Sequence, residues 1–174
     1  AGNGEFWCLR YVEAGKTVAL STSPDGANSV SAFSSVVGAT IDGNGQATVS
    51  QTGLYLVYVD LNRKLLAFEK PEVYGTGECF GGGEVKADIV GDKLSLNTAS
   101  TGALKLYATS KYNARDWNTM LLTINNGKLV YPGLNTNNVP AVPVAKQTTV
   151  NLNVAEGSAD FGDPTPENKL PGSV

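Results

Sequence analysis

The pattern of apolar and polar positions alternates with a period of two along most of the chain. Leu94 and Leu96 alternate with polar residues, and residues 150–154 do the same. Such alternation is typical of a strand with one face in the core and the other in water. Residues 54–61 form a run rich in β-branched and aromatic side chains, which also favours a strand. No segment combines helical spacing with helix caps, so the sequence predicts an all-β chain.

Turn signals separate these predicted strands. Asn126-Gly127 lies between the runs 121–124 and 128–131, and this arrangement predicts a β-hairpin with a type I′ turn. Other clusters supply positive φ angles or side chains that bond their own backbone. They are Pro24-Asp25-Gly26, Asp42-Gly43-Asn44-Gly45, Asn62-Arg63, Gly81-Gly82-Gly83 and Gly91-Asp92. The spacing of these signals indicates many short strands.

An offset of 87 positions gives an internal repeat without a gap. The identical positions are Gly4 with Gly91, Leu9 with Leu96, Gly15 with Gly102, and Thr22-Ser23 with Thr109-Ser110. Each copy also ends in a long alternating strand, at residues 53–61 in the first and 148–154 in the second. The repeat therefore predicts two tandem β-sandwich domains rather than one large barrel.

The boundary between the two predicted domains falls near Lys70-Pro71, because a proline there ends one set of strands. The first domain then covers residues 1–70 and the second covers residues 71–162. The second opens with a leading strand, Val73–Thr76, that has no counterpart in the first. We therefore expect the first domain to lack its N-terminal strand and the natural protein to start earlier. The Pro-rich residues 163–174 predict a linker or tail.

Composition narrows the possible partners. Apolar residues make up 41% of the chain and charged residues 17%, against about 25% charged in typical domains. This balance excludes an intrinsically disordered chain. The net charge of −3 gives no electrostatic reason to bind nucleic acid or an anionic membrane surface. The longest apolar run, residues 54–59, is far shorter than the roughly 18 residues that a membrane-spanning helix needs.

Histidine is absent from the whole sequence, which removes the commonest general base and the commonest zinc ligand. A serine nucleophile would need a lysine partner, and no Ser-x-x-Lys motif occurs. Cys8 and Cys79 cannot complete a four-ligand zinc site by themselves. They are either free thiols or the two ends of one long-loop disulfide. We therefore expect a chain without enzyme activity, cofactor or metal.

Glycine-containing segments carry two weak binding motifs. Asp42-Gly-Asn-Gly resembles the opening of a calcium loop, but Gly53 stands where that loop needs its last carboxylate. A simple hairpin turn is the alternative. Gly75-Thr-Gly77 and residues 81–83 suggest a phosphate cradle, but no Gly-Lys-Ser/Thr leading into a helix follows. Tight turns and close strand approach are the alternative there.

The two tryptophans are the remaining candidates for ligand contact. Trp7 falls on apolar Leu94 in the repeat, so it is either a core residue or an exposed platform. Trp117 follows a polar stretch between two predicted strands. The possible sugar-binding side chains beside it are Lys111, Tyr112, Asn113 and Arg115. A pyranose stacks on an aromatic ring while amide and charged groups bond its hydroxyls, so Trp117 is either a glycan platform or a plug at the end of a sandwich.

Three segments carry a family resemblance. They are Leu104-Lys-Leu-Tyr-Ala-Thr-Ser through Trp117 to Met120 followed by Asn125 to Gly133, Glu72-Val-Tyr-Gly-Thr-Gly-Glu-Cys-Phe-Gly-Gly-Gly83, and Gly53-Leu-Tyr-Leu-Val-Tyr-Val-Asp-Leu61. Together they resemble the SusE/SusF-like outer-membrane lipoproteins of Bacteroidetes, and the similarity covers about residues 4–162. Asn118 and Glu84 stand at positions where that family usually has an aromatic residue.

The resemblance implies tandem immunoglobulin-like modules that bind a polysaccharide, such as a starch-like glycan, for an uptake system. It also implies a lipid anchor upstream of this chain at the bacterial cell surface, with outer-membrane importer components as partners. The site it implies is the segment with Lys111, Tyr112, Asn113, Arg115 and Trp117. The alternative is a structural spacer or adhesin pair of immunoglobulin-like domains without a small ligand.

Overall fold

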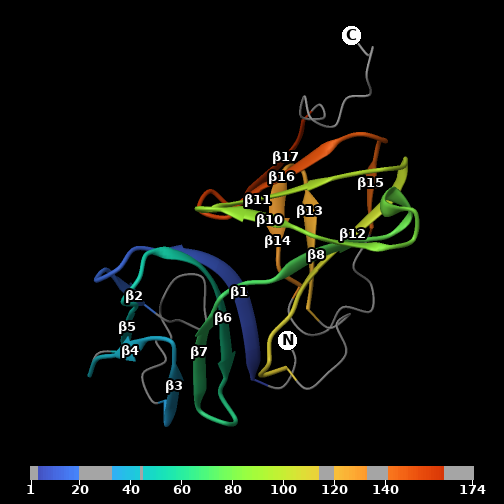
Figure 1. The fold of residues 1–174 in the computed structure, drawn as a ribbon. Helices are drawn as coiled ribbons and strands as arrows, with labels where there is room; N and C mark the ends of the chain where they lie inside the picture. The colour runs from blue at the N-terminus through green and yellow to red at the C-terminus, as the bar shows by residue number, and fades with distance from the viewer. Residues whose placement is uncertain (1–3, 20–32, 44, 114–119, 133–140, 163–174) are drawn as a thin grey trace.

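The computed structural model describes residues 4–19, 33–43, 45–113, 120–132 and 141–162. This part consists of β-strands and one 3-10 turn at Glu78–Phe80, without an α-helix, which confirms the all-β fold class. No helix found in the described ranges is long and apolar enough to cross a membrane. The strands form two groups, and none of the described strands within residues 5–69 pairs with one within residues 73–162 (Figure 1).

The first strand group has two sheets. The larger sheet has the order β1-β6-β7-β3, in which β3 is parallel to β7 and the other pairs are antiparallel. Its strands are β1 (Glu5–Val12), β6 (Gly53–Asp60), β7 (Leu65–Glu69) and β3 (Ser35–Val37). The smaller sheet has the order β2-β5-β4. Its strands are β2 (Thr17–Ala19), β5 (Gln46–Thr48) and β4 (Thr40–Ile41).

The second strand group is a ten-stranded sheet with the order β10-β11-β16-β17-β14-β13-β12-β8-β9, and β15 pairs with the first half of β12. One half holds β10 (Asp88–Val90), β11 (Lys93–Asn97), β16 (Thr149–Asn153), β17 (Ser158–Gly162) and β14 (Lys128–Val130). The other half holds β13 (Leu121–Asn125), β12 (Gly102–Ala108), β8 (Val73–Thr76), β9 (Glu84–Lys86) and β15 (Val142–Val144). Alternating burial along β8, β11 and β16 turns one side of each strand inward.

The strand pairing follows the internal repeat of the sequence. Leu9 in β1 pairs with Leu56 in β6, and Leu96 in β11 pairs with Val150 in β16. In the first group β6 then pairs with β7, the next strand along the chain, and in the second group β16 pairs with β17. The repeat matches β2 of the first group with β12 of the second. Among the described strands β2 pairs with β5 alone, whereas β12 pairs with β8 in addition to its other neighbours.

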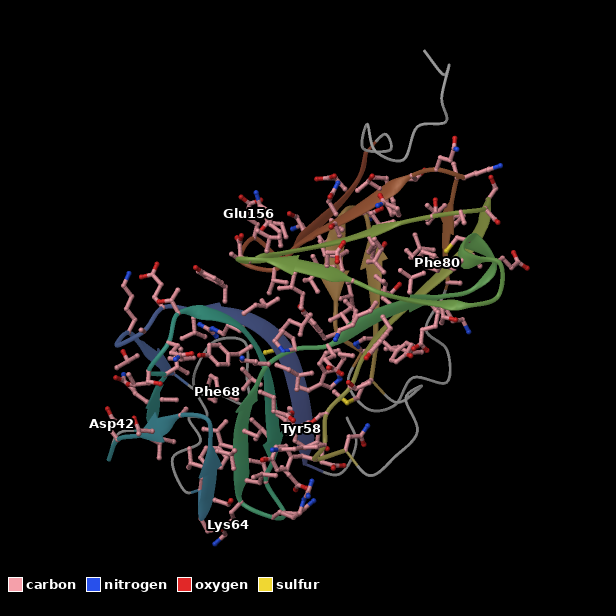
Figure 2. All side chains as sticks on the ribbon, in the orientation of Figure 1. Asp42, Tyr58, Lys64, Phe68, Phe80 and Glu156 are labelled. Atoms are coloured by element: carbon pink, nitrogen blue, oxygen red, sulfur yellow. The ribbon has the colours of Figure 1, made fainter. Side chains whose placement is uncertain are left out.

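The two groups share a hydrophobic core. Along β6, Leu56 and Tyr58 point into a cluster that also contains Leu106 and Leu152 of the second group, whereas Val57 points into a separate cluster within the first group. The larger sheet of the first group is therefore buried on both faces. Figure 2 shows Tyr58 on the side of the first group that faces the second. Because the core is continuous, the division into domains at residues 70–71 stays a prediction.

Trp7 belongs to this shared core. Its side chain is 5% exposed, and its ring meets the ring of Tyr131 edge-on at a centroid distance of 5.4 Å. The interpretation of Trp7 as a core residue is confirmed, and its alternative as an exposed platform is wrong. Cys8 and Cys79 are free thiols, so the disulfide alternative is also wrong. Burial raises the pKa of both thiols.

The turn chemistry follows the local sequence. Asn126 and Gly127 have φ angles of 50° and 72°, as the predicted type I′ hairpin between β13 and β14 requires. Asp42 closes a turn by accepting a hydrogen bond from the backbone N–H of Gln46 at 2.9 Å. Gly77, with a φ of 117°, leads into the 3-10 turn, and a Cβ there would lie 2.3 Å from the carbonyl oxygen of Ala103. This glycine segment thus forms tight turns against a neighbouring strand.

Candidate functional site

The candidate site is the connection between β12 and β13. The two strands are hydrogen-bonded up to its base, because the Ala108 N–H donates to the Met120 carbonyl at 3.1 Å. On the other side, the Thr109 N–H donates to the Glu72 carbonyl at 3.2 Å. The connection therefore leaves and rejoins a fixed sheet, which is the usual placement of a binding loop.

Three of the predicted site residues lie in one turn at the start of this connection. The Tyr112 N–H donates to Ser110 Oγ at 3.2 Å, and the Asn113 N–H donates to the Ser110 carbonyl at 3.2 Å. Lys111 is exposed, and its Nζ lies 5.2 Å from the ring centroid of Tyr112. Arg115 and Trp117 lie outside the described residues, so their part of the site stays a prediction.

Tyr112 packs against other side chains rather than extending into solvent. Its ring is half-buried, packs against the shared core, and lies 6.4 Å from the ring of Tyr58 with an interplanar angle of 34°. The Tyr58 hydroxyl in turn donates to Glu5 Oε1 at 2.7 Å. Tyr112 thus joins the start of the connection to the first strand group, and any sugar contact it makes uses the part of the ring that this packing leaves open.

The first strand group also holds the backbone of this turn. The Glu69 carboxylate accepts from Ser110 Oγ at 2.5 Å and from the Lys111 N–H at 3.4 Å. Arg63 Nη2 donates to the Tyr112 carbonyl at 2.8 Å. Hydrogen bonds to charged groups are stronger than those between neutral groups, so these contacts hold the turn against the first strand group.

Asp60 orients Arg63 for this contact. Arg63 Nε donates to Asp60 Oδ2 at 2.5 Å, and the backbone N–H groups of Asn62 and Arg63 donate to Asp60 Oδ1. Burial acts to raise the pKa of Asp60, but these hydrogen bonds and the Arg63 charge outweigh it and hold the pKa below its usual value. Asp60 therefore stays ionised and keeps the guanidinium in place at neutral pH.

Sequence reasoning missed Glu69, Arg63 and Asp60 as parts of this region. The sequence marked Asn62-Arg63 as a turn, but nothing local connects it with Tyr112, which lies 49 residues further along the chain. Their charged groups fix the backbone beside the predicted site residues Lys111, Tyr112 and Asn113. Among the residues that the structure describes, no three Cys, Asp or Glu side chains come together as a metal site.

Comparison with known proteins gives a structural match and no sequence-family match. No protein-family model matches the sequence, and no curated protein matches it significantly. A solved structure, that of SusF from Bacteroides thetaiotaomicron, superposes on 91% of this chain with a TM-score of 0.75 and 24% sequence identity. The chain shares the fold of SusF. The SusE/SusF-like prediction is thus confirmed at the level of the fold, and the chain corresponds to 40% of the SusF chain.

Proposed function

We propose that this chain is a non-catalytic glycan-binding module with its site on the connection between β12 and β13. The observation that carries the proposal is the SusF fold across 91% of the chain, together with the sequence resemblance to the glycan-binding SusE/SusF-like lipoproteins. The fixed turn at Ser110–Asn113 supports it, since it holds Lys111 near the ring of Tyr112 at the start of the connection. Charged and amide groups next to an aromatic ring suit a neutral polyhydroxylated ligand.

Trp117 would provide the main contact. A sugar stacked on this ring contributes on the order of 1–2 kcal/mol, from the apolar area removed from water. Lys111, Asn113 and Arg115 can donate to hydroxyl groups, and the open part of the Tyr112 ring can add a second apolar contact. A single site of this strength binds weakly, so firm capture needs several sites that act together.

The same proposal places the protein at the surface of a bacterial outer membrane. A lipid group upstream of this chain would anchor it there, and outer-membrane glycan-import components would be its partners. The division into residues 1–70, residues 71–162 and a tail belongs to the proposal too. The test of localisation is fractionation of the host: recovery of the full-length protein from the cytosol contradicts it.

Binding is tested by screening the chain on a glycan array and comparing it with Trp117→Ala. We expect the unchanged chain to bind a neutral polysaccharide and the variant to lose that binding while its circular dichroism spectrum is unchanged. Phe161→Ala is the matched control, because Phe161 is a 44% exposed aromatic residue on β17. Unfolding of Trp117→Ala would mark Trp117 as a core residue, and absence of binding to any glycan would favour the structural spacer.

A further inference from the structure

We infer that the outer face of β9-β8-β12 is a second glycan-contact surface, built around Tyr74. This inference rests on the proposed function and names a further part of the ligand surface. The strand register places two rows of side chains on this face. The rows are Lys86, Tyr74 and Tyr107 in one and Glu84, Thr76 and Lys105 in the other.

Two stacked tyrosine rings form the centre of this face. The rings of Tyr74 and Tyr107 lie 5.2 Å apart with an interplanar angle of 20°. Tyr107 is 5% exposed, whereas Tyr74 is partly exposed and so is the ring that a ligand can reach. The inward neighbours of Tyr74 in β8, Val73 and Gly75, are buried in the core, so the backbone beneath the ring is fixed.

Hydrogen bonds hold the polar side chains around these rings. The Tyr107 hydroxyl donates to Glu84, and the Tyr74 hydroxyl donates to Glu72 Oε2 at 3.2 Å. Lys86 Nζ donates to Glu72 Oε1 at 3.2 Å. Burial and the hydrogen bond to Glu84 raise the pKa of Tyr107, so its hydroxyl stays protonated and keeps its role as a donor. Side chains fixed in this way lose little entropy when a ligand binds.

The charges on this face favour a neutral ligand. Glu72 and Glu84 carry two negative charges, and Lys86 and Lys105 carry two positive charges, so the formal charges cancel. An aromatic ring surrounded by acceptors and donors of balanced charge suits a sugar chain, because hydroxyl groups can both accept and donate. An anionic or cationic ligand would meet as much repulsion as attraction here.

The outer face of the other half of the ten-stranded sheet offers a comparison. There the side chains of Asp88, Ser95, Asn151 and Asp160 form a row across β10, β11, β16 and β17, beside a concavity of about 300 Å³. This row contains no aromatic ring and thus no surface on which a pyranose can stack. The concavity alone therefore does not make it the better candidate.

The tyrosine face adjoins the two described ends of the connection between β12 and β13. Glu72 bonds through its carbonyl to Thr109, the first residue of the connection, and Tyr107 lies one residue before Ala108, which bonds Met120 at the other end. We therefore expect a long oligosaccharide bound at the connection to extend over Tyr74. This arrangement predicts that Tyr74 matters for long chains of sugar and not for short ones.

The test is affinity electrophoresis of the chain in gels that contain amylopectin, xylan or mannan, followed by calorimetry with oligosaccharides of the polysaccharide that retards it. Tyr74→Leu keeps a large apolar side chain in the sheet and removes the flat ring, whereas Tyr74→Phe keeps the ring. We expect Tyr74→Leu to bind a long oligosaccharide about five- to tenfold more weakly and a disaccharide unchanged, and Tyr74→Phe to retain most of the affinity. Ser95→Ala on β11, in the other half of the ten-stranded sheet, is the matched control.

The outcomes separate the two proposals. Equal binding by Tyr74→Leu and the unchanged chain, with loss in Trp117→Ala, overturns the inference and leaves the proposed function standing. Loss of binding in Ser95→Ala would move the second surface to the outer face of β10, β11, β16 and β17 and would also overturn the inference. If none of the three polysaccharides retards the unchanged chain, the proposed function fails and the inference fails with it.

Discussion

Replacing Leu56 with alanine is expected to destabilise both strand groups together. Leu56 lies in the middle of β6 and is fully buried in the cluster that the two groups share. Leu152 of β16 is a fully buried member of the same cluster from the second group. A cavity at Leu56 therefore removes contacts from both groups, although the residue belongs to the first.

The size of the effect follows from burial. Deleting a fully buried leucine side chain costs about 2–5 kcal/mol, since transfer free energy and cavity formation add. In a chain of this length each 1 kcal/mol lowers Tm by roughly 2–4 °C, so a loss of about 3 kcal/mol lowers it by roughly 6–12 °C. Val90→Ala is the control, because Val90 is 78% exposed and its truncation is expected to change stability by less than about 0.5 kcal/mol.

Amide hydrogen exchange gives the decisive measurement. If the shared core makes the chain one cooperative unit, Leu56→Ala lowers the protection of amides in β6 and in β16 by the same free energy. Protection that falls in β6 while β16 keeps its original values would refute this reasoning. The two groups would then unfold independently, and their contact would contribute little to stability.

Two further predictions concern backbone geometry and pH. Gly77→Ala is expected to destabilise the chain by about 1–3 kcal/mol in urea unfolding. The reason is that a Cβ at a φ of 117° would lie 2.3 Å from the Ala103 carbonyl oxygen. Gly43→Ala is the control, because a Cβ there would meet open space and should have a far smaller effect. The pKa of Asp60 is lowered by Arg63, so the unfolded chain binds this proton more readily than the folded chain. The stability from Asp60 is therefore full above about pH 4 and is lost as the pH falls further, and Asp60→Asn should flatten this part of a pH series of urea midpoints.

The strands were predictable where local sequence decides them. Alternation at Leu94 and Leu96 predicted the strand β11, and the same period at residues 150–154 predicted β16. The alternation arises because one face of each strand packs in the core and the other faces water. The Asn126-Gly127 hairpin was predictable since these two residues tolerate the positive φ angles of a type I′ turn. The repeat also indicated which strands play matching roles, and the pairing of β1 with β6 and of β11 with β16 agrees with it.

The site was less predictable because its contacts are long-range. Ser110 bonds Glu69 across 41 residues, and Arg63 bonds the Tyr112 carbonyl across 49. Periodicity and turn signals describe neighbours along the chain, so they carry no information on such pairs. The stacked rings of Tyr74 and Tyr107 were hidden in the same way, because only the register of β8 on β12 places them side by side.

One sequence feature did carry long-range information. The run in β6 is apolar at successive positions rather than alternate ones, and a strand of this kind needs cover on both faces. The smaller sheet of the first group covers one face, and the second group covers the other. That second contact brings Tyr58 to Tyr112 and Glu69 to Ser110, so the apolar run that builds the shared core also sets the geometry of the candidate site.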